Sequence, residues 1–481
     1  MNVEVACSTD NMVKIAIIGA GSIVFCSTFL NDIFRVPELD GCEIALMSPT
    51  QNKVGKVKNY AEKIIKKNNL KTKVYATSDR RDALKGAKYV ICTFQIGGID
   101  AFAYDYEIPM KYGVNQCIAD SLGPGGVFRL LRSTPLYDDI DKEVAELCPD
   151  AYILNYVNPM GALCTYLAEY TNLNYVGLCH GVQTTMDLIS GYVGVDKDQI
   201  DFVAAGINHM AWFLKLEHNG KDLYPTLREN IEKPEYYVNE KVRGEVLRQC
   251  GYFMTESTGH LSEYLPWFRK NEHSLKTYCD MPEFGGESGA AYYFSKKIAE
   301  KYLNEDVFDL ESGELDPRSK EYCSYIIEAI ETGVPFLFNG NVSNNELFIS
   351  NLPAGSCVEV PIYADRQGLH PMSMGCLPPH LAAMNQSNIT VQALAALAAK
   401  HADPEMVFWA IAMDPLTSAV LTLDQIRDMT IELFEAEKPW LPQFEGKTLK
   451  KTPLISIPEN VKPLDVPLDP ALAISARFGK L

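Results

Sequence analysis

A cysteine and a histidine are the residues of this sequence whose types most directly suggest metal chemistry. Cys179 lies in the run Cys179-His180-Gly181, and His209 follows 30 residues later at the end of Gly206-Ile207-Asn208-His209. A thiolate and an imidazole are both metal ligands, and a site with two protein ligands leaves open positions for a substrate. The pair could therefore share one divalent ion, although a lone cysteine or histidine in an apolar setting is more often a packed core residue.

Two loops combine ionisable side chains with flexible or aromatic residues. Residues 120–129 begin with Asp120, end with Arg129 and have a glycine-rich stretch between them. Residues 256–268 bring acids, a histidine, hydroxyls and aromatic rings into 13 positions. The composition of residues 256–268 suits acid/base catalysis or sugar binding, with a hydrogen-bonded structural loop as the alternative. For residues 120–129 the alternative to a functional loop is a structural turn.

A glycine turn near the N-terminus has the features of a dinucleotide-binding site. Residues 14–18 read as a strand and run directly into Gly19-Ala20-Gly21. Glycines here allow a tight turn and a close approach to a pyrophosphate, and the N-terminus of the following helix favours an anion. We therefore expect a nicotinamide dinucleotide to bind at this turn through Gly19, Gly21, Ser22 and Ile23.

Two positions depart from the usual dinucleotide fingerprint. Val24 stands where a third glycine is common, and Ser48 stands near the end of the second strand, where an acidic residue usually binds the ribose hydroxyls. The context of a strand before the turn and a helix after it supports cofactor binding. The choice between NAD and NADP stays open.

Parallel strands joined by helices are expected to position these groups. Short β-branched runs predict strands at 14–18, 43–47, 89–94, 152–155 and 175–178, and residues 53–69 have the apolar spacing of a surface helix. Polar or glycine-rich clusters follow the later strands, at 97–98, 158–161 and 179–181. Because ligands of open α/β sheets bind outside the carboxyl ends of the strands, these clusters should converge on one crevice.

The pattern changes after residue 201. A strand at 210–216, a hairpin turn at Asn219-Gly220 and a return strand at 221–224 are followed by helices at 391–400, 404–413 and 423–437. We predict an α/β protein in which residues 1–205 form a Rossmann-like, doubly wound NAD-binding domain. Residues 206–481 should form a mixed α+β domain for catalysis, substrate binding and oligomerisation.

Composition narrows the function classes. The 481 residues carry a net charge of −18, which disfavours binding to nucleic acid or to an anionic membrane surface. No apolar run approaches the roughly 20 residues of a membrane span. The 13 cysteines lack the dense spacing of a secreted disulfide framework. We expect a cytoplasmic protein with reduced thiols.

Taken together, these motifs resemble those of the family 4 glycoside hydrolases. The resemblance is carried by the Gly19 turn and by the segments 120–132, 158–161, 179–181, 206–209 and 262–268. It continues through 351–353, 358–361 and 414–417, and so covers nearly the whole chain. The resemblance implies a C-terminal domain like that of lactate and malate dehydrogenases, and a homodimer or homotetramer.

The family resemblance implies an unusual route to glycoside cleavage. NAD+ takes hydride from C3 of the sugar, a divalent metal such as Mn2+ polarises the new ketone, and a base removes the C2 proton. The aglycone leaves by elimination, water adds, and the same cofactor reduces C3 again. Family 4 enzymes are thus an exception to the two-carboxylate scheme of most glycosidases.

Carried over position by position, the resemblance assigns roles to individual residues. Cys179 and His209 become the metal ligands, Tyr264 the base, and His180 the proton donor. A further set is expected at the catalytic centre or in substrate binding: Asp120, Arg129, Asn158, His260 and Glu263. Because a thiolate is an unusual ligand for the hard manganese ion, activity should depend on thiol reduction.

The run Cys179-His180-Gly181 resembles the branch that cleaves α-linked uronic acids, whereas Cys-His-Ser is typical of α-galactosidases. The expected substrate is therefore an α-galacturonide or α-glucuronide, with Arg129, Arg132 and Arg269 as candidate partners for its carboxylate. An α-galactoside or α-glucoside is the alternative within the family. Outside it, a true 2-hydroxy acid dehydrogenase and a non-catalytic sugar or dinucleotide sensor are the rivals.

Overall fold

The computed structural model describes residues 12–21, 23–304 and 314–464, together with 466, 469–471, 474 and 478. Residues 1–449 cluster into one compact unit and residues 450–481 into a second. The stretch 450–464 contains no helix or strand. In the described part of the chain, no helix combines the length and the apolar character needed to cross a membrane.

Six parallel strands form the first half of one large sheet. Their spatial order is β3-β2-β1-β4-β5-β6, the arrangement of a Rossmann fold. The strands are β1 (Lys14–Ile18), β2 (Glu43–Met47), β3 (Lys73–Thr77), β4 (Tyr89–Cys92), β5 (Tyr152–Asn155) and β6 (Asn174–Gly177). The five strands expected from the sequence are confirmed to within two residues at each end. The expected α/β, Rossmann-like fold class is therefore confirmed.

The helices of this half connect and cover the parallel strands. They are α1 (Ile23–Phe34), α2 (Gln51–Lys67), α3 (Arg80–Leu84), α4 (Gly98–Lys111), α5 (Gly123–Leu147), α6 (Met160–Tyr170) and α7 (Gly181–Val193). In α2 the predicted apolar stripe is the buried face, formed by Val54, Val57, Ala61 and Ile64. The 3.6-residue spacing therefore identified the helix and its inward face.

The strand β3 was not predicted from the sequence. It is the outermost strand of the parallel half, and its residues are half-buried or exposed. An edge strand packs on fewer neighbours, so its sequence carries a weaker apolar signal than a central strand.

The sheet continues into the second half through antiparallel strands. Those strands are β7 (Asp201–Ile207), β8 (Met210–His218), β9 (Lys221–Asp222), β10 (Phe336–Ser343), β11 (Cys357–Asp365) and β12 (Gly368–Pro371). The predicted hairpin joins β8 to β9, with φ of 50° at Asn219 and 73° at Gly220. Two positive φ angles are what a two-residue hairpin turn requires. The division at residues 205 and 206 stays a proposal, because β7 runs through it within the compact unit.

The two halves of the sheet meet along one row of residues. Gly177 of β6 pairs with Asn341 of β10, which pairs with Glu359 of β11, which pairs with Gly206 of β7. The junctions of β6 with β10 and of β11 with β7 each consist of a single pair. Cys179 follows this row by two residues and His209 by three, so the junction brings both to one place.

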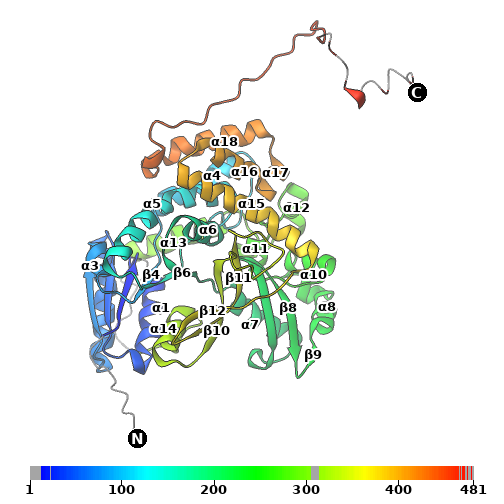
Figure 1. The fold of residues 1–481 in the computed structure, drawn as a ribbon. Coiled ribbons are helices and arrows are strands. Elements are labelled where there is room, and N and C mark those ends of the chain that lie inside the picture. The colour runs from blue at the N-terminus through cyan, green and yellow to red at the C-terminus, as the bar shows by residue number, and fades with distance from the viewer. Residues whose placement is uncertain are drawn as a thin grey trace. The chain divides into compact units, whose positions relative to one another are not determined.

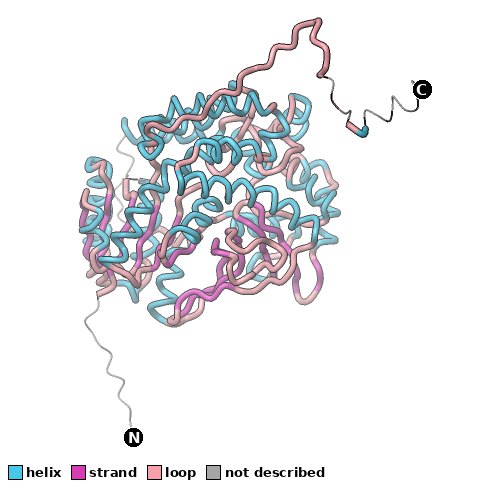
Figure 2. Tube along the Cα trace, turned by 45° about the horizontal axis from the view of Figure 1, so that its top comes forward, coloured by secondary structure: helices cyan, strands magenta, loops and turns pink. Residues whose placement is uncertain are grey.

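Helices of the second half pack over the sheet and around its loops. They are α8 (Tyr224–Ile231), α9 (Pro234–Tyr237), α10 (Arg243–Cys250), α11 (Thr258–Leu261), α12 (Glu272–Tyr278), α13 (Ala290–Asn304), α14 (Tyr322–Thr332), α15 (Pro379–His401), α16 (Pro404–Ala412), α17 (Pro415–Val420) and α18 (Leu423–Glu437). Figure 1 shows α5, α15, α16 and α18 stacked on one side of the sheet. In Figure 2 the strands lie together beneath this helical layer.

The long helix α15 ties the two halves together. It packs against α5, α6 and α16, and it buries Asn385, Asn388 and Gln392 on its inner side. Asn385 donates to the carbonyl of Met210 (2.7 Å), directly after the His209 turn. Buried amides that are hydrogen-bonded to backbone fix the loops they touch.

Candidate functional site

The glycine turn lies where β1 approaches β2 and β4. Backbone N–H groups of Gly19 and Ala20 donate to the carbonyl of Met47 (3.0 and 2.9 Å). Gly19 has a φ of 98°, and a Cβ on it would lie 2.5 Å from the carbonyl oxygen of Thr93. Only glycine fits this position. Ile23 is the first residue of α1, and Ser22 lies outside the described residues.

Ser48 occupies the place usually held by an acidic residue. Its hydroxyl accepts a hydrogen bond from the N–H of Thr50 (3.2 Å) and would lie 3.0 Å from a Cβ on Gly21. The short Ser48 side chain is therefore buried and hydrogen-bonded to the backbone of its own loop.

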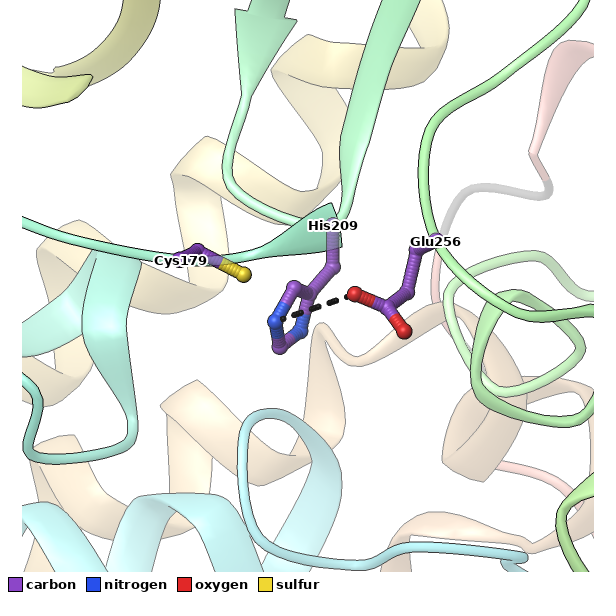
Figure 3. Close-up of side chains that lie close together, drawn as sticks. All are labelled: Cys179, His209 and Glu256. Carbon is purple, nitrogen blue, oxygen red and sulfur yellow. Dashed lines mark ion pairs between the residues drawn. The ribbon is translucent and has the colours of Figure 1, made fainter. Parts of the chain in front are cut away.

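Cys179, His209 and Glu256 form a compact cluster of possible metal ligands. The thiol sulfur, an imidazole nitrogen and a carboxylate oxygen all lie within 4.8 Å of one another. Figure 3 shows the three side chains pointing toward a common space, with His209 Nε2 3.4 Å from Glu256 Oε2. Sulfur, nitrogen and oxygen donors at this spacing fit a divalent ion.

Burial and mutual interactions set the charges of this cluster. Burial raises the pKa of the Cys179 thiol well above its usual range, and the charges of Glu256 and Glu359 raise it further. Burial and His260 lower the pKa of His209 to about 4. Burial alone would raise the pKa of the Glu256 carboxyl, but His209 and His260 bring it well below its usual range. The cluster therefore combines a thiol, a neutral imidazole and a carboxylate.

A second group links the residues directly before α5 to the Asn158 loop. The glycine-rich stretch expected as part of a loop at 120–129 is the first turn of α5, and Arg129 also lies in this helix. Asn158 Nδ2 donates to Asp120 Oδ2 (3.1 Å), and the Ser121 hydroxyl donates to Asp120 Oδ1 (2.5 Å). Arg129 lies 3.8 Å from the same carboxylate and donates to the carbonyl of Asn158 (3.3 Å). Burial would raise the pKa of Asp120, yet Arg129 and His260 leave it below its usual value. Asp120 is therefore an ionised hydrogen-bond acceptor.

Tyr264 connects the two groups. Its hydroxyl lies 3.1 Å from His209 Nδ1, and its backbone carbonyl accepts from Asn388 of α15 (3.1 Å). Burial raises the pKa of the phenol well above its usual range, and Asp120 and Glu256 add to this effect. The hydrogen bond to Nδ1 leaves Nε2 as the nitrogen of His209 that faces Cys179 and Glu256.

His180 and His260 differ in their exposure to solvent. His180 directly precedes α7. Its side chain is 53% exposed, and its Nδ1 lies 3.4 Å from Glu321 Oε1. His260 is buried, with its ring centroid 4.1 Å from that of His209. Among the described residues, His260 Nε2 has no hydrogen-bond partner. The imidazole of His180 is thus exposed to solvent, whereas that of His260 is buried and has one ring nitrogen without a hydrogen-bond partner among the described residues.

The carboxylate of Glu263 is fully engaged by the loop that leads to Asp120. It accepts hydrogen bonds from the Gln116 side chain (2.9 Å) and from the backbone N–H groups of Ile118 and Ala119. These contacts favour a positioning role for Glu263 toward Asp120.

The three arginines expected near a uronate carboxylate differ in their surroundings. Arg132 is completely buried and paired with Asp105 (2.6 Å) and with Glu437. Arg269 is also buried, and it donates to two backbone carbonyls and two serine hydroxyls. Of these three, only Arg129 lies beside the candidate site.

Two acidic residues of the site were not assigned from the sequence. Glu256 is 47 residues from His209, a separation that no metal-binding spacing suggests. Glu359 is buried, its pKa is raised to about 8 by burial and by Glu256, and its Oε1 has no partner in the described structure. Its place in the 358–361 motif was the one signal that could have drawn attention to it.

Comparison with known proteins identifies the family. The model described as "Family 4 glycosyl hydrolase" matches residues 14–195, and the model of that family's C-terminal domain matches residues 204–417. α-Galactosidases of Rhizobium meliloti (strain 1021) and Bacillus subtilis (strain 168) are each 39% identical over 440 residues. The matches cover 90% of this chain and 89% and 100% of the relatives.

More distant relatives match over similar lengths. An α-galacturonidase of Lachnoclostridium phytofermentans is 28% identical over 464 residues, which cover 90% of this chain and 97% of the relative. A solved structure of a 6-phospho-α-glucosidase from gut microorganisms, in complex with NAD and Mn2+, has the same fold. Its TM-score is 0.75 at 17% identity, with 89% of this chain and 99% of that chain covered. This chain therefore belongs to the family 4 glycosyl hydrolases.

Proposed function

We propose that this protein hydrolyses α-galactosides with NAD+ and a divalent metal such as Mn2+ as resident cofactors. One observation carries the proposal. The ligand cluster at Cys179 and His209 adjoins Asp120, Asn158 and Tyr264 in a chain 39% identical to two α-galactosidases. The reaction is oxidation at C3, elimination of the aglycone across C1 and C2, addition of water, and reduction at C3.

The residues present fit both cofactors. The Gly19 turn leads from β1 directly into the N-terminus of α1, where a pyrophosphate would bind, and Cys179 and His209 offer sulfur and nitrogen to a divalent ion. When bound, NAD+ supplies reversible hydride transfer at C3, and the metal supplies polarisation of the C3 oxygen. Because the same hydride is returned, no net oxidation occurs.

The side chains around the cluster would bind the sugar and transfer its protons. Asp120, an ionised acceptor held by Asn158, would bind a sugar hydroxyl, as would the free Nε2 of His260. Tyr264 would remove the C2 proton, since its hydroxyl lies against the imidazole that faces the metal position. His180, at the exposed side, would protonate the departing aglycone.

The charges around the site favour a neutral sugar over a uronic acid. Arg132 and Arg269 are used within the protein, and Arg129 already faces the carboxylate of Asp120. A uronate would have to compete with Asp120 for this one guanidinium. Together with the sequence identities, this favours α-galactosides as the first substrate class.

An α-galacturonide is the second candidate. It is favoured by the Cys179-His180-Gly181 run, which resembles the uronide-cleaving branch, and by the position of Arg129 next to Asn158. The two substrates differ only at C6, so a direct comparison of their turnover decides between them.

The test is a panel of nitrophenyl α-galactoside, α-galacturonide, α-glucoside, α-glucuronide and β-galactoside, with NAD+, Mn2+ and a thiol reductant. We expect fastest release of nitrophenol from the α-galactoside, no net NADH, and strong loss of activity in Cys179→Ser. Faster cleavage of the α-galacturonide would select the second candidate. Net NADH formation would select a dehydrogenase, and NAD+ binding without any turnover would select a sensor.

The expectations on assembly and location rest on the family resemblance and on the cysteines, which form no disulfide among the described residues. A homodimer or homotetramer predicts a mass of two or four chains by light scattering. A cytoplasmic location fits a metal site whose thiol must stay reduced, and fractionation of cells tests it.

A further inference from the structure

Gly181 is the residue that allows Glu256 to approach the metal ligands. A Cβ placed on Gly181 would lie 2.9 Å from Glu256 Oε2 and 3.6 Å from Cys179 Sγ. The first distance is shorter than carbon–oxygen contacts in folded proteins tolerate. Any residue other than glycine would therefore require this carboxylate to leave its observed position beside Cys179 and His209.

The backbone of Glu256 is held in a conformation that non-glycine residues seldom adopt. Its φ is 82°. Such a conformation costs free energy and persists only where the surroundings impose it, most often at functional sites. Here Arg243 donates to the Glu256 carbonyl (2.6 Å), and the N–H of Ser257 donates to Oε1 (3.0 Å). The second carboxylate oxygen, Oε2, faces His209.

The donor atoms complement one another chemically. His209 uses Nδ1 toward Tyr264, so its Nε2 is the nitrogen that Glu256 Oε2 approaches at 3.4 Å. A thiolate and an imidazole alone favour soft or borderline ions, whereas a carboxylate oxygen is the donor that Mn2+ prefers. A thiolate and a carboxylate together also balance the charge of a divalent ion.

We propose that Glu256 is a third protein ligand of the divalent ion, and that Gly181 admits it. The proposal rests on the proposed metal binding by Cys179 and His209. It gives Gly181, the residue after Cys179-His180, an indirect role in metal coordination through Glu256, separate from any contact with the sugar. Three protein donors leave about three positions of an octahedral ion for substrate oxygens and water.

The test measures Mn2+ affinity directly, from the electron paramagnetic resonance signal of free Mn2+ in titrations of the reduced full-length protein with NAD+. We expect Glu256→Gln, Cys179→Ser and Gly181→Ala each to weaken Mn2+ binding by about tenfold or more. Glu321→Gln is the matched control, since Glu321 pairs with His180 outside the cluster, and it should change affinity less than twofold. Circular dichroism and thermal midpoints verify that each variant is folded.

A double variant isolates the role of Gly181. If Gly181→Ala acts only by displacing the carboxylate, it should add no further loss of Mn2+ affinity in a Glu256→Ala background. Additive losses would overturn the role of Gly181, because the methyl group would then disturb something other than Glu256.

The remaining outcomes separate this inference from the proposed function. Wild-type Mn2+ affinity in Glu256→Gln, together with loss in Cys179→Ser, would overturn Glu256 as a ligand and leave the Cys179 and His209 site intact. Wild-type affinity in all three of Cys179→Ser, His209→Ala and Glu256→Gln would overturn the metal site itself. A loss of Mn2+ but not Zn2+ affinity in Glu256→Gln would support a carboxylate that selects the harder ion.

Discussion

At the residue scale, most groups of the site are constrained by partners from distant parts of the chain. Tyr264 contacts His209 through its hydroxyl and α15 through its carbonyl, and Asp120 is held by Asn158. These bonds orient side chains before any substrate arrives, which reduces the entropy lost on binding.

Tyr264→Phe removes one hydroxyl and keeps the ring, so the fold should be unchanged. We expect kcat to fall by about 100-fold or more, because the proposed base for the C2 proton is lost. NAD+ affinity should stay near that of the wild type. Tyr236→Phe, a change on α9 outside the site, is the control.

Isotope labelling provides a second readout for Tyr264. Product formed by the wild type in D2O should carry deuterium at C2, because the base exchanges its proton with solvent. Unlabelled C2 in product from active, NAD+-dependent enzyme would argue against elimination and for direct displacement at C1.

At the element scale, a buried ion-pair network joins three helices. Arg132 of α5 bonds Asp105 of α4 and Glu437 at the end of α18, and all three side chains are buried. Removing one partner of a buried network leaves charges without compensation.

Arg132→Met should therefore destabilise the protein strongly, by about 3–5 kcal/mol. The expected signs are a lower thermal midpoint and a reduced soluble yield. The pair of Arg427 and Glu405 is more exposed to solvent and offers a control, since Arg427→Met should cost about 1 kcal/mol or less. Equal effects of the two changes would contradict a structural role for Arg132.

The buried carboxyl group of Asp414 caps the N-terminus of α17 (Pro415–Val420), and its burial disfavours the charged form. Asp414 accepts hydrogen bonds from the N–H (2.8 Å) and hydroxyl (2.6 Å) of Thr417, and burial raises its pKa to about 6. A raised folded-state pKa means that the folded protein binds this proton more tightly than the unfolded chain. Its stabilising effect is thus complete below pH 4 and is lost as the pH rises toward 6.

Asp414→Asn keeps an acceptor for Thr417 and cannot ionise. We expect the thermal midpoint of the variant to vary less than that of the wild type between pH 4 and 7. A gap in favour of the variant should open as the pH rises, approaching about 3 kcal/mol above pH 6. Parallel pH profiles of the two proteins would contradict this account.

At the scale of the whole molecule, one compact unit contains the complete candidate site. The glycine turn, the ligand cluster and the helices that support them all lie within residues 1–449. Residues 450–481 form a separate unit that includes none of the residues assigned to the site.

A chain ending at Leu449 should therefore fold and bind Mn2+ with the affinity of the full-length protein. Thermal unfolding and the Mn2+ titration measure this directly. A large loss of stability or of metal affinity would show that residues 450–481 support the compact unit.

The sequence by itself determined the local elements and the chemistry of the motifs. Central strands such as β1 and β4, the stripe of α2 and the Asn219-Gly220 hairpin follow from spacing and from glycine stereochemistry, which act over a few residues. The edge strand β3 was not predicted, because it pairs with a neighbouring strand on one side only and so has a weaker apolar pattern. Cys179 and His209 were recognised as a possible pair by their types and by the family resemblance.

Only the tertiary structure decided which charged groups meet. The missing side chain of Gly181 allows the Glu256 carboxylate to lie close to Cys179. Arg132 is paired with Glu437, 305 positions away, and is therefore not available to the site. Electrostatic pairing depends on distance and burial in the folded chain, and neither is encoded in the spacing of residues along it. The sheet junction at Gly177, Asn341, Glu359 and Gly206 brings Cys179 and His209 together, and Glu256 joins them from a separate segment to complete the proposed metal site.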